Sequence, residues 1–113
     1  MAKKYVPSGY QIIDLGEIGD LSDIKILTKS SSADAKTLID IFKNGKIYQK
    51  PLFIHLVSKD MGFEISFNGY IMNNNIQHTV FADDGTALDN LVIVYNSETE
   101  NISIQLVPLS LGH

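Results

Sequence analysis

The sequence of 113 residues contains no cysteine and no arginine. Without cysteine the chain has no disulfide, no thiolate ligand for a metal and no cysteine nucleophile. All nine basic residues are lysines, and the net charge is −4. Arginine supplies the planar, two-pronged donor that binds phosphates and guanine edges, so an acidic chain without it is a poor candidate for nucleic-acid binding. We therefore expect no nucleic-acid partner.

Long apolar runs are also missing. The longest, such as residues 91–95, are far shorter than the roughly 20 residues that span a bilayer. The first seven residues lack the apolar segment of a signal peptide. We expect no membrane partner, and a protein that is made in the cytoplasm and stays there unless it leaves as part of a larger particle.

The residues that are present predict one domain with a single helix over about 33–44. Its apolar residues recur at i, i+3, i+4 and i+7 and so form one stripe: Ala35, Leu38, Ile39 and Phe42. Ser31 or Ser32 can cap the start of the helix, and Asn44-Gly45 is a typical stop signal. We therefore expect one amphipathic helix.

Seven runs have strand character and are bounded by turn residues. Five follow the helix, and two shorter runs precede it: 51–58, 63–72, 76–81, 91–95, 102–107, 11–15 and 24–28. Neighbouring strands joined by short loops should pair antiparallel. The predicted fold class is α+β, a mostly antiparallel β-sheet with one amphipathic helix packed on it.

The chain is expected to divide into three parts. Residues 1–31 are predicted to form an extended N-terminal arm with two short strands, because Pro7, Gly9, Gly16 and Gly19 interrupt this region. Residues 32–107 form the domain of helix and antiparallel strands, and residues 108–113 form a C-terminal tail. The arm is predicted to dock or exchange during assembly.

The residues that could carry catalysis or hold a metal have ordinary explanations. The loop 83–89 contains three aspartates, but their spacing is not that of a calcium loop and Asp-Gly is typical of a turn. His55, His78 and His113 do not have the spacing of a metal site, and no acid or nucleophile lies near them in sequence. No serine elbow or phosphate loop is present. We predict no catalytic, cofactor-binding or metal residues, no cofactor, and no enzyme activity.

Two predicted strands are apolar on both faces. In 52–57, Phe53 and Val57 point away from three apolar neighbours, and in 91–95 the same holds for Val92 and Val94. Such strands are usually covered on both sides. We expect one sheet face to meet a partner or a second copy, with a two-layer sandwich that covers itself as the alternative. The predicted partner-binding residues are Tyr5, Val6, Tyr10, Phe53, Val57, Val92 and Val94.

The order of elements and several short sequence segments resemble those of small structural domains of tailed bacteriophages. These segments are 9–16 (GYQIIDLG), the end of the predicted helix at 44–46 (NGK), and 94–96 (VYN), which precedes a polar turn. The resemblance is to head-fibre, decoration and tail-associated proteins, and it covers most of the chain as a pattern. It implies a virion component whose arm docks on the particle and whose β-rich body oligomerises, with no catalytic residues to transfer.

The leading hypothesis is a non-enzymatic structural protein that acts by oligomerisation and docking. Its expected partners are copies of itself and other virion proteins, and its expected location is the virion. The alternative is a small cytoplasmic binding module for a peptide or a carbohydrate. That module would use Tyr48, Tyr70 and the turn at 73–75, because tyrosine combines a flat apolar face with a polar tip.

Overall fold

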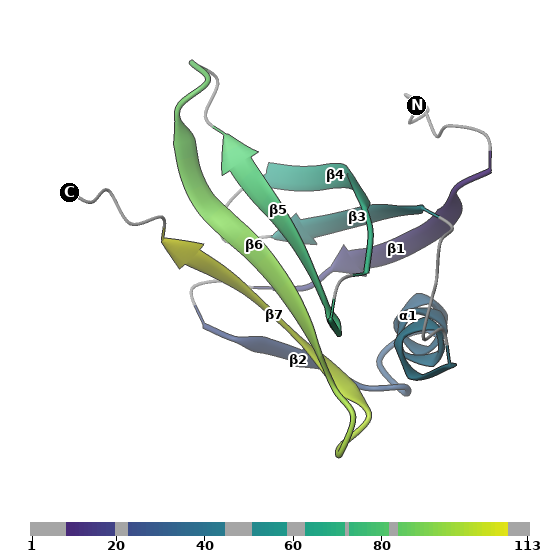
Figure 1. Ribbon diagram of the computed structural model, residues 1–113. Helices are drawn as coiled ribbons and strands as arrows, with labels where there is room; N and C mark the ends of the chain where they lie inside the picture. The colour runs from purple at the N-terminus through teal and green to yellow at the C-terminus, as the bar shows by residue number, and fades with distance from the viewer. Residues whose placement is uncertain are drawn as a thin grey trace.

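The computed structural model describes residues 9–19, 23–44, 51–58, 63–71, 73–81 and 84–108. In this part of the chain seven strands and one helix follow one another (Figure 1). In chain order they are β1 (Gln11–Glu17), β2 (Lys25–Leu27), α1 (Ala33–Asn44), β3 (Leu52–Ser58), β4 (Phe63–Gly69), β5 (Asn75–Phe81), β6 (Ala87–Asn96) and β7 (Asn101–Pro108). The predicted α+β class with a single helix is confirmed.

The strands form two sheets. Sheet A has the order β1-β3-β4, and sheet B has the order β2-β7-β6-β5. Every pairing is antiparallel except that of β1 with β3, which is parallel. Parallel neighbours need a long crossover connection, and here β2 and α1 lie between them in the sequence. The mostly antiparallel character was predicted, whereas this parallel pair was not.

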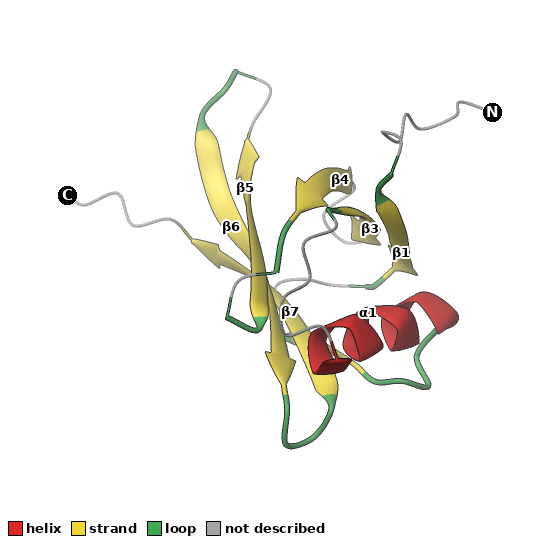
Figure 2. Ribbon diagram, turned by 45° about the vertical axis from the view of Figure 1, so that its right-hand side comes forward, coloured by secondary structure: helices red, strands yellow, loops and turns green. Residues whose placement is uncertain are grey.

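The two sheets enclose one core, and α1 lies near one end of them, beside β1 (Figure 2). The predicted helical stripe is buried, and the ring of Phe42 stacks on that of Tyr95 in sheet B with centroids 5.4 Å apart. The core contains the buried residues Ile13, Leu15, Ile18, Leu27, Ala35, Leu38, Ile39, Phe42, Leu52, Ile54, Leu56, Phe67, Ile76, Leu91, Ile93, Tyr95, Ile102 and Ile104. The inner sheet faces therefore cover each other, as in the two-layer alternative.

Side-chain hydrogen bonds fix the start of α1. The hydroxyl of Ser32 accepts a hydrogen bond from the backbone N–H of Ala35 at 3.0 Å, so Ser32 is the N-cap. The carboxylate of Asp34 accepts a hydrogen bond from the backbone N–H of Asp14 at 2.6 Å. This second bond joins the first turn of the helix to β1, next to the bulge between Asp14 and Gly16.

The described part of the predicted N-terminal arm belongs to the body of the fold. β1 pairs with β3 and β2 pairs with β7, so each extends one of the two sheets. Ile13, Leu15 and Leu27 are core residues. The two short strands predicted within residues 1–31 are present as β1 and β2, and each belongs to one of the two sheets. Residues 1–8 and the end of the predicted tail, 109–113, lie outside the described residues.

Candidate functional site

The structure places the predicted partner-binding residues on different surfaces. Val92 and Val94 alternate with the core residues of β6 and lie on the outer face of sheet B. Phe53 and Val57 alternate with the core residues of β3 on the other face of sheet A, where Phe53 is buried and Val57 is half-buried. Tyr10 is half-buried just before β1. Tyr5 and Val6 lie outside the described residues, so the described members of the set form two surfaces.

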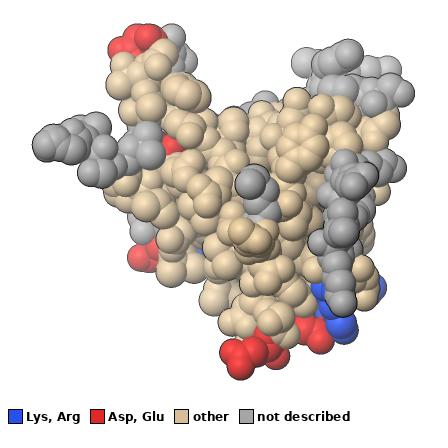
Figure 3. Space-filling model, viewed as in Figure 1, with Lys and Arg blue, Asp and Glu red and all other residues tan. Residues whose placement is uncertain are grey.

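The outer face of sheet B carries no ionisable side chain among its described strand residues. It consists of Ile26, Asn75, Gln77, Thr79, Asn90, Val92, Val94, Ser103, Gln105 and Val107, which lie opposite one another in the strand register. Ile26 is 56% exposed and Val94 is 40% exposed. In the view of Figure 3, the coloured Lys, Asp and Glu side chains lie mostly towards the edges of the visible surface. This face therefore combines exposed apolar groups with neutral polar ones.

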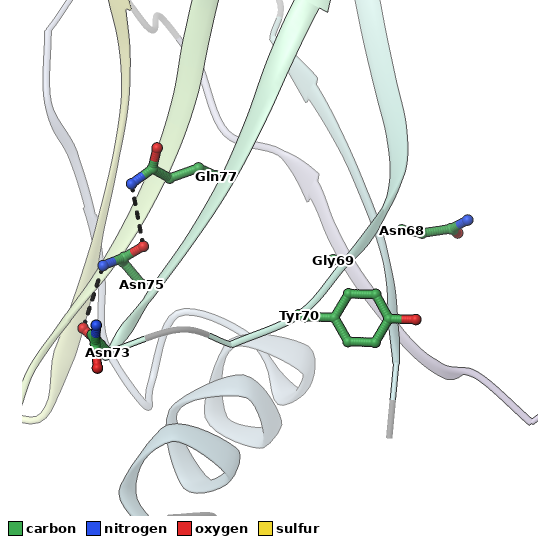
Figure 4. Close-up of a pocket in the computed structure, with 6 residues that line it drawn as sticks. All are labelled: Asn68, Gly69, Tyr70, Asn73, Asn75 and Gln77. Carbon is green, nitrogen blue, oxygen red and sulfur yellow. Dashed lines mark hydrogen bonds between the residues drawn. The ribbon is translucent and has the colours of Figure 1, made fainter. Parts of the chain in front are cut away.

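A chain of amide side chains runs along one side of this face. The amide of Asn75 donates to the backbone carbonyl of Asn73 at 3.3 Å, and the amide of Gln77 donates to Asn75 Oδ1 at 3.4 Å (Figure 4). Gln77 Oε1 in turn accepts a hydrogen bond from Asn90 Nδ2 at 3.0 Å. These bonds hold the amides in one orientation relative to each other.

A pocket of about 440 Å³ lies where this amide chain meets the end of β4. Its lining comprises Asn68, Gly69, Tyr70, Asn73, Asn75 and Gln77. In Figure 4 the three β5-side amides form a column, and Tyr70 and Asn68 extend on the other side of the Gly69 backbone. Tyr70 is 56% exposed. The pocket is open, neutral and lined by one aromatic ring and several amides.

Local backbone features shape this pocket. Asn73 and Asn74 adopt left-handed φ angles of 52° and 65°, a region in which asparagine is enriched. The carbonyl of Asn74 accepts a hydrogen bond from the N–H of Tyr95 at 2.8 Å, which fixes the turn against β6. The predicted turn is confirmed, although Asn75 already begins β5. Tyr48, the other tyrosine of the binding hypothesis, lies outside the described residues.

Gly69 allows the end of β4 to approach β5 closely. A Cβ atom at this position would lie 3.0 Å from Cγ2 of Ile76 and 3.4 Å from the ring of Phe67. Contacts of that length are tighter than ordinary packing, so a larger residue would separate the two strands. The close approach sets the positions of the two sides of the pocket relative to each other.

A histidine and an acid that are far apart in the sequence meet on sheet A. His55 Nδ1 lies 3.0 Å from Asp14 Oδ1, and the same oxygen accepts a hydrogen bond from the N–H of Gly16 at 2.9 Å. Ser66 lies opposite His55 in the strand register. We interpret the His55–Asp14 contact as a link that holds β1 to β3 at the bulge.

His78 lies on β5 of sheet B and is half-buried. Its ring stacks on Phe67 of sheet A, with centroids 4.4 Å apart and planes 9° apart. It follows the core residue Ile76 by two positions, so its side chain points towards the opposite sheet. Burial lowers the pKa of His78 below its ordinary value. His78 therefore joins the two sheets as a neutral ring.

The described part of the aspartate loop has the geometry of a turn. Asp84 Oδ1 accepts a hydrogen bond from the N–H of Thr86 at 2.9 Å, and hydrogen bonds from Thr86 lower the pKa of this carboxyl. Asp83 lies outside the described residues. Among the residues that the structure describes, no group of three His, Asp or Glu side chains is placed to hold a metal ion.

A second set of charges joins the turn between β6 and β7 to the helix. Glu100 forms ion pairs with Lys29 at 2.7 Å and with Lys43 at 3.1 Å. Hydrogen bonds from Lys29, and then from Lys43, lower the pKa of Glu100. All three side chains are partly exposed, which is typical of surface ion pairs and not of a buried site.

The remaining evidence concerns the membrane and known proteins. Within the described ranges, no helix has the length and apolar character needed to cross a bilayer. Comparison of the chain with protein-family models, with curated protein sequences and with solved structures gave no match.

Proposed function

We propose that this chain is a non-enzymatic assembly protein that associates with copies of itself through the outer face of sheet B. The observation that carries the proposal is that the described strand residues of that face include no ionisable side chain, although the whole chain has a net charge of −4. Two copies can approach through this face without the repulsion that like charges cause at an interface. Exposed Ile26, Val94 and Val107 supply apolar area to bury.

The polar groups of the face suit the same role. Asn90, Ser103 and Gln105 carry both donors and acceptors, so the same groups on a second copy can satisfy them. A two-fold symmetric contact requires such self-complementarity, because each patch meets itself. A specific interface needs roughly 800 Å² per subunit. The four strands of sheet B supply one continuous surface for it.

The resemblance of 9–16, 44–46 and 94–96 to tailed-phage structural domains supports a place in a virion. The partners there would be other copies of the chain and other virion proteins. This part of the proposal is tested by density-gradient centrifugation of particles from the producing host. We expect the chain to sediment with intact particles, and its complete recovery in the unassembled fraction would contradict the virion role.

Self-association is tested by sedimentation equilibrium of the wild type, Val94→Lys and the control Thr37→Lys. The two variants add the same charge, but Val94 lies on the outer face of sheet B and Thr37 is exposed on α1. We expect the wild type and Thr37→Lys to form the same oligomer with the same dissociation constant. The dissociation constant of Val94→Lys should be at least about tenfold higher. A wild type that stays monomeric at high concentration, or equal association of both variants, would overturn the proposal. Circular dichroism of all three proteins checks that the fold is intact.

A further inference from the structure

The pocket at the end of β4 has no Lys, His, Asp or Glu side chain among its described lining residues, which are Asn68, Gly69, Tyr70, Asn73, Asn75 and Gln77. A charged ligand would lose its hydration there without gaining an opposite charge. The volume of about 440 Å³ is within the range of small-molecule sites. The chemistry of the lining therefore favours a neutral ligand.

The amides of the pocket match a ligand that carries hydroxyl groups. A carboxamide presents N–H donors and a carbonyl acceptor side by side, whereas a hydroxyl both donates and accepts. Asn75 and Gln77 are two residues apart on β5, so they lie on the same face and about 7 Å apart along the strand. The hydrogen bonds from Gln77 to Asn75 and from Asn75 to the Asn73 carbonyl hold the amides in place before a ligand arrives.

Tyr70 supplies the apolar part of the pocket. Its side chain is largely exposed, and Figure 4 shows the ring on the Asn68 side of the Gly69 backbone, pointing away from the amide column. Tyrosine combines a flat apolar ring with a hydroxyl and loses little conformational freedom on binding. The C–H face of one sugar unit can pack on the ring of Tyr70, while hydroxyl groups of the same carbohydrate reach the amides of Asn75 and Gln77.

We propose that this pocket binds a neutral carbohydrate, with Tyr70 as the stacking residue and Asn75 and Gln77 as the hydrogen-bonding residues. β4 and β5 are edge strands, so a peptide would pair with their backbone groups, whereas the ring of Tyr70 and the amide side chains favour a sugar. Displacement of a sugar by a peptide is therefore one outcome of the test. Asn75 and Gln77 also lie at the β5 edge of the outer face of sheet B, so self-association through that face would bring a second copy close to these amides, and sugar binding is measured on the Val94→Lys variant as well as on the wild type.

The probes are four hexasaccharides: maltohexaose, cellohexaose, mannohexaose and the acidic hexamer of galacturonic acid. Each is titrated into the ¹⁵N-labelled protein, and the backbone and side-chain amide signals are followed by NMR. We expect at least one neutral hexasaccharide to shift the side-chain amide signals of Asn75 and Gln77, and the acidic hexamer to bind at least about tenfold more weakly.

Two variants and one control locate the site. Tyr70→Ala removes the aromatic ring. Gln77→Leu replaces the amide side chain with an apolar side chain of similar size. Each substitution should weaken sugar binding about tenfold or more. Phe81→Ala is the control, because Phe81 is an equally exposed aromatic residue on β5 (60% exposed) that does not line the pocket. Its binding should equal that of the wild type. Thermal melts check that all variants are folded.

Three results would overturn the proposal. The first is that no neutral hexasaccharide binds at 10 mM, which is about the weakest affinity that such a titration detects. The second is that Tyr70→Ala and the wild type bind the sugar equally well. The third is that an uncharged peptide displaces a bound sugar at a lower concentration than that of the sugar. Repeating the titration on Val94→Lys separates this proposal from self-association. Sugar binding by that variant would support the pocket even if the wild type proved monomeric, whereas no sugar binding by a folded, monomeric Val94→Lys would reject the pocket alone.

Discussion

The imidazole ring of His78 lies flat against the phenyl ring of Phe67, with centroids 4.4 Å apart and planes 9° apart. β4 and β5 follow each other in the chain but belong to different sheets. The stack therefore joins sheet A to sheet B at the point where the chain crosses between them. Because burial lowers the pKa of His78, this link depends on pH.

Acid should weaken the fold through His78. Its pKa is lowered from 6.5 in the folded state, so the unfolded chain binds this proton more readily. The free energy of unfolding is then at its full value above pH 6.5 and falls as pH drops from 6.5 to the lowered pKa. Urea titrations between pH 7.5 and 5 should show a smaller loss of stability for His78→Phe, which keeps a stacked ring that does not titrate. Identical pH profiles for the two proteins would contradict the assignment.

The helix should contribute through its buried stripe. Leu38 is fully buried, so Leu38→Ala should lower the free energy of unfolding by about 2–5 kcal/mol by creating a cavity. Lys36→Ala is the matched control on the exposed side of α1, where it removes a surface i,i+4 ion pair with Asp40 and should leave the free energy of unfolding nearly unchanged. Denaturant titrations measure both values. Equal effects at the two positions would show that α1 does not pack as described.

Gly69 and Ile76 should be energetically coupled. Gly69→Ala places a methyl group 3.0 Å from Ile76 Cγ2, so we expect a loss of about 1–3 kcal/mol from overpacking. In an Ile76→Ala background the same change should cost much less, because the contacting methyl group is gone. The control combines Gly69→Ala with Leu38→Ala on the helix, where the two losses should add. Additivity in both double variants would refute the close contact.

The helix and the strand patterns were predictable from sequence because their signals are local. Capping by a serine at 31 or 32, the stripe through Leu38 and the alternation in 63–67 are readable within one element. The parallel pairing of β1 with β3 and the pairing of β2 with β7 join distant segments. No local residue pattern specifies such a partner, since the register is chosen by packing of the whole core.

The candidate site was predictable only in part. Tyr70 and the turn at 73–75 were identified because tyrosine and asparagine have recognisable chemistry. Asn68 and Gln77 were missed, although alternation along β5 already placed Gln77 on the same side as Asn75. The alternation of Ile76, His78 and Val80 also held the signal for the buried position of His78. The contact of His55 with Asp14 had no such signal, because it depends on the parallel pairing of their strands.

The parallel pairing of β1 with β3 also imposes an order on folding. β5, β6 and β7 are consecutive and pair with their sequence neighbours, so their contacts close only short loops. β1 instead pairs with β3, and β2 pairs with β7, the last strand, so both pairings join segments that are distant in the sequence. Closing longer loops costs more entropy and slows the formation of distant contacts. We expect the β5–β7 meander to gain protection from hydrogen exchange first in a refolding experiment, while the N-terminal strands close the two sheets last.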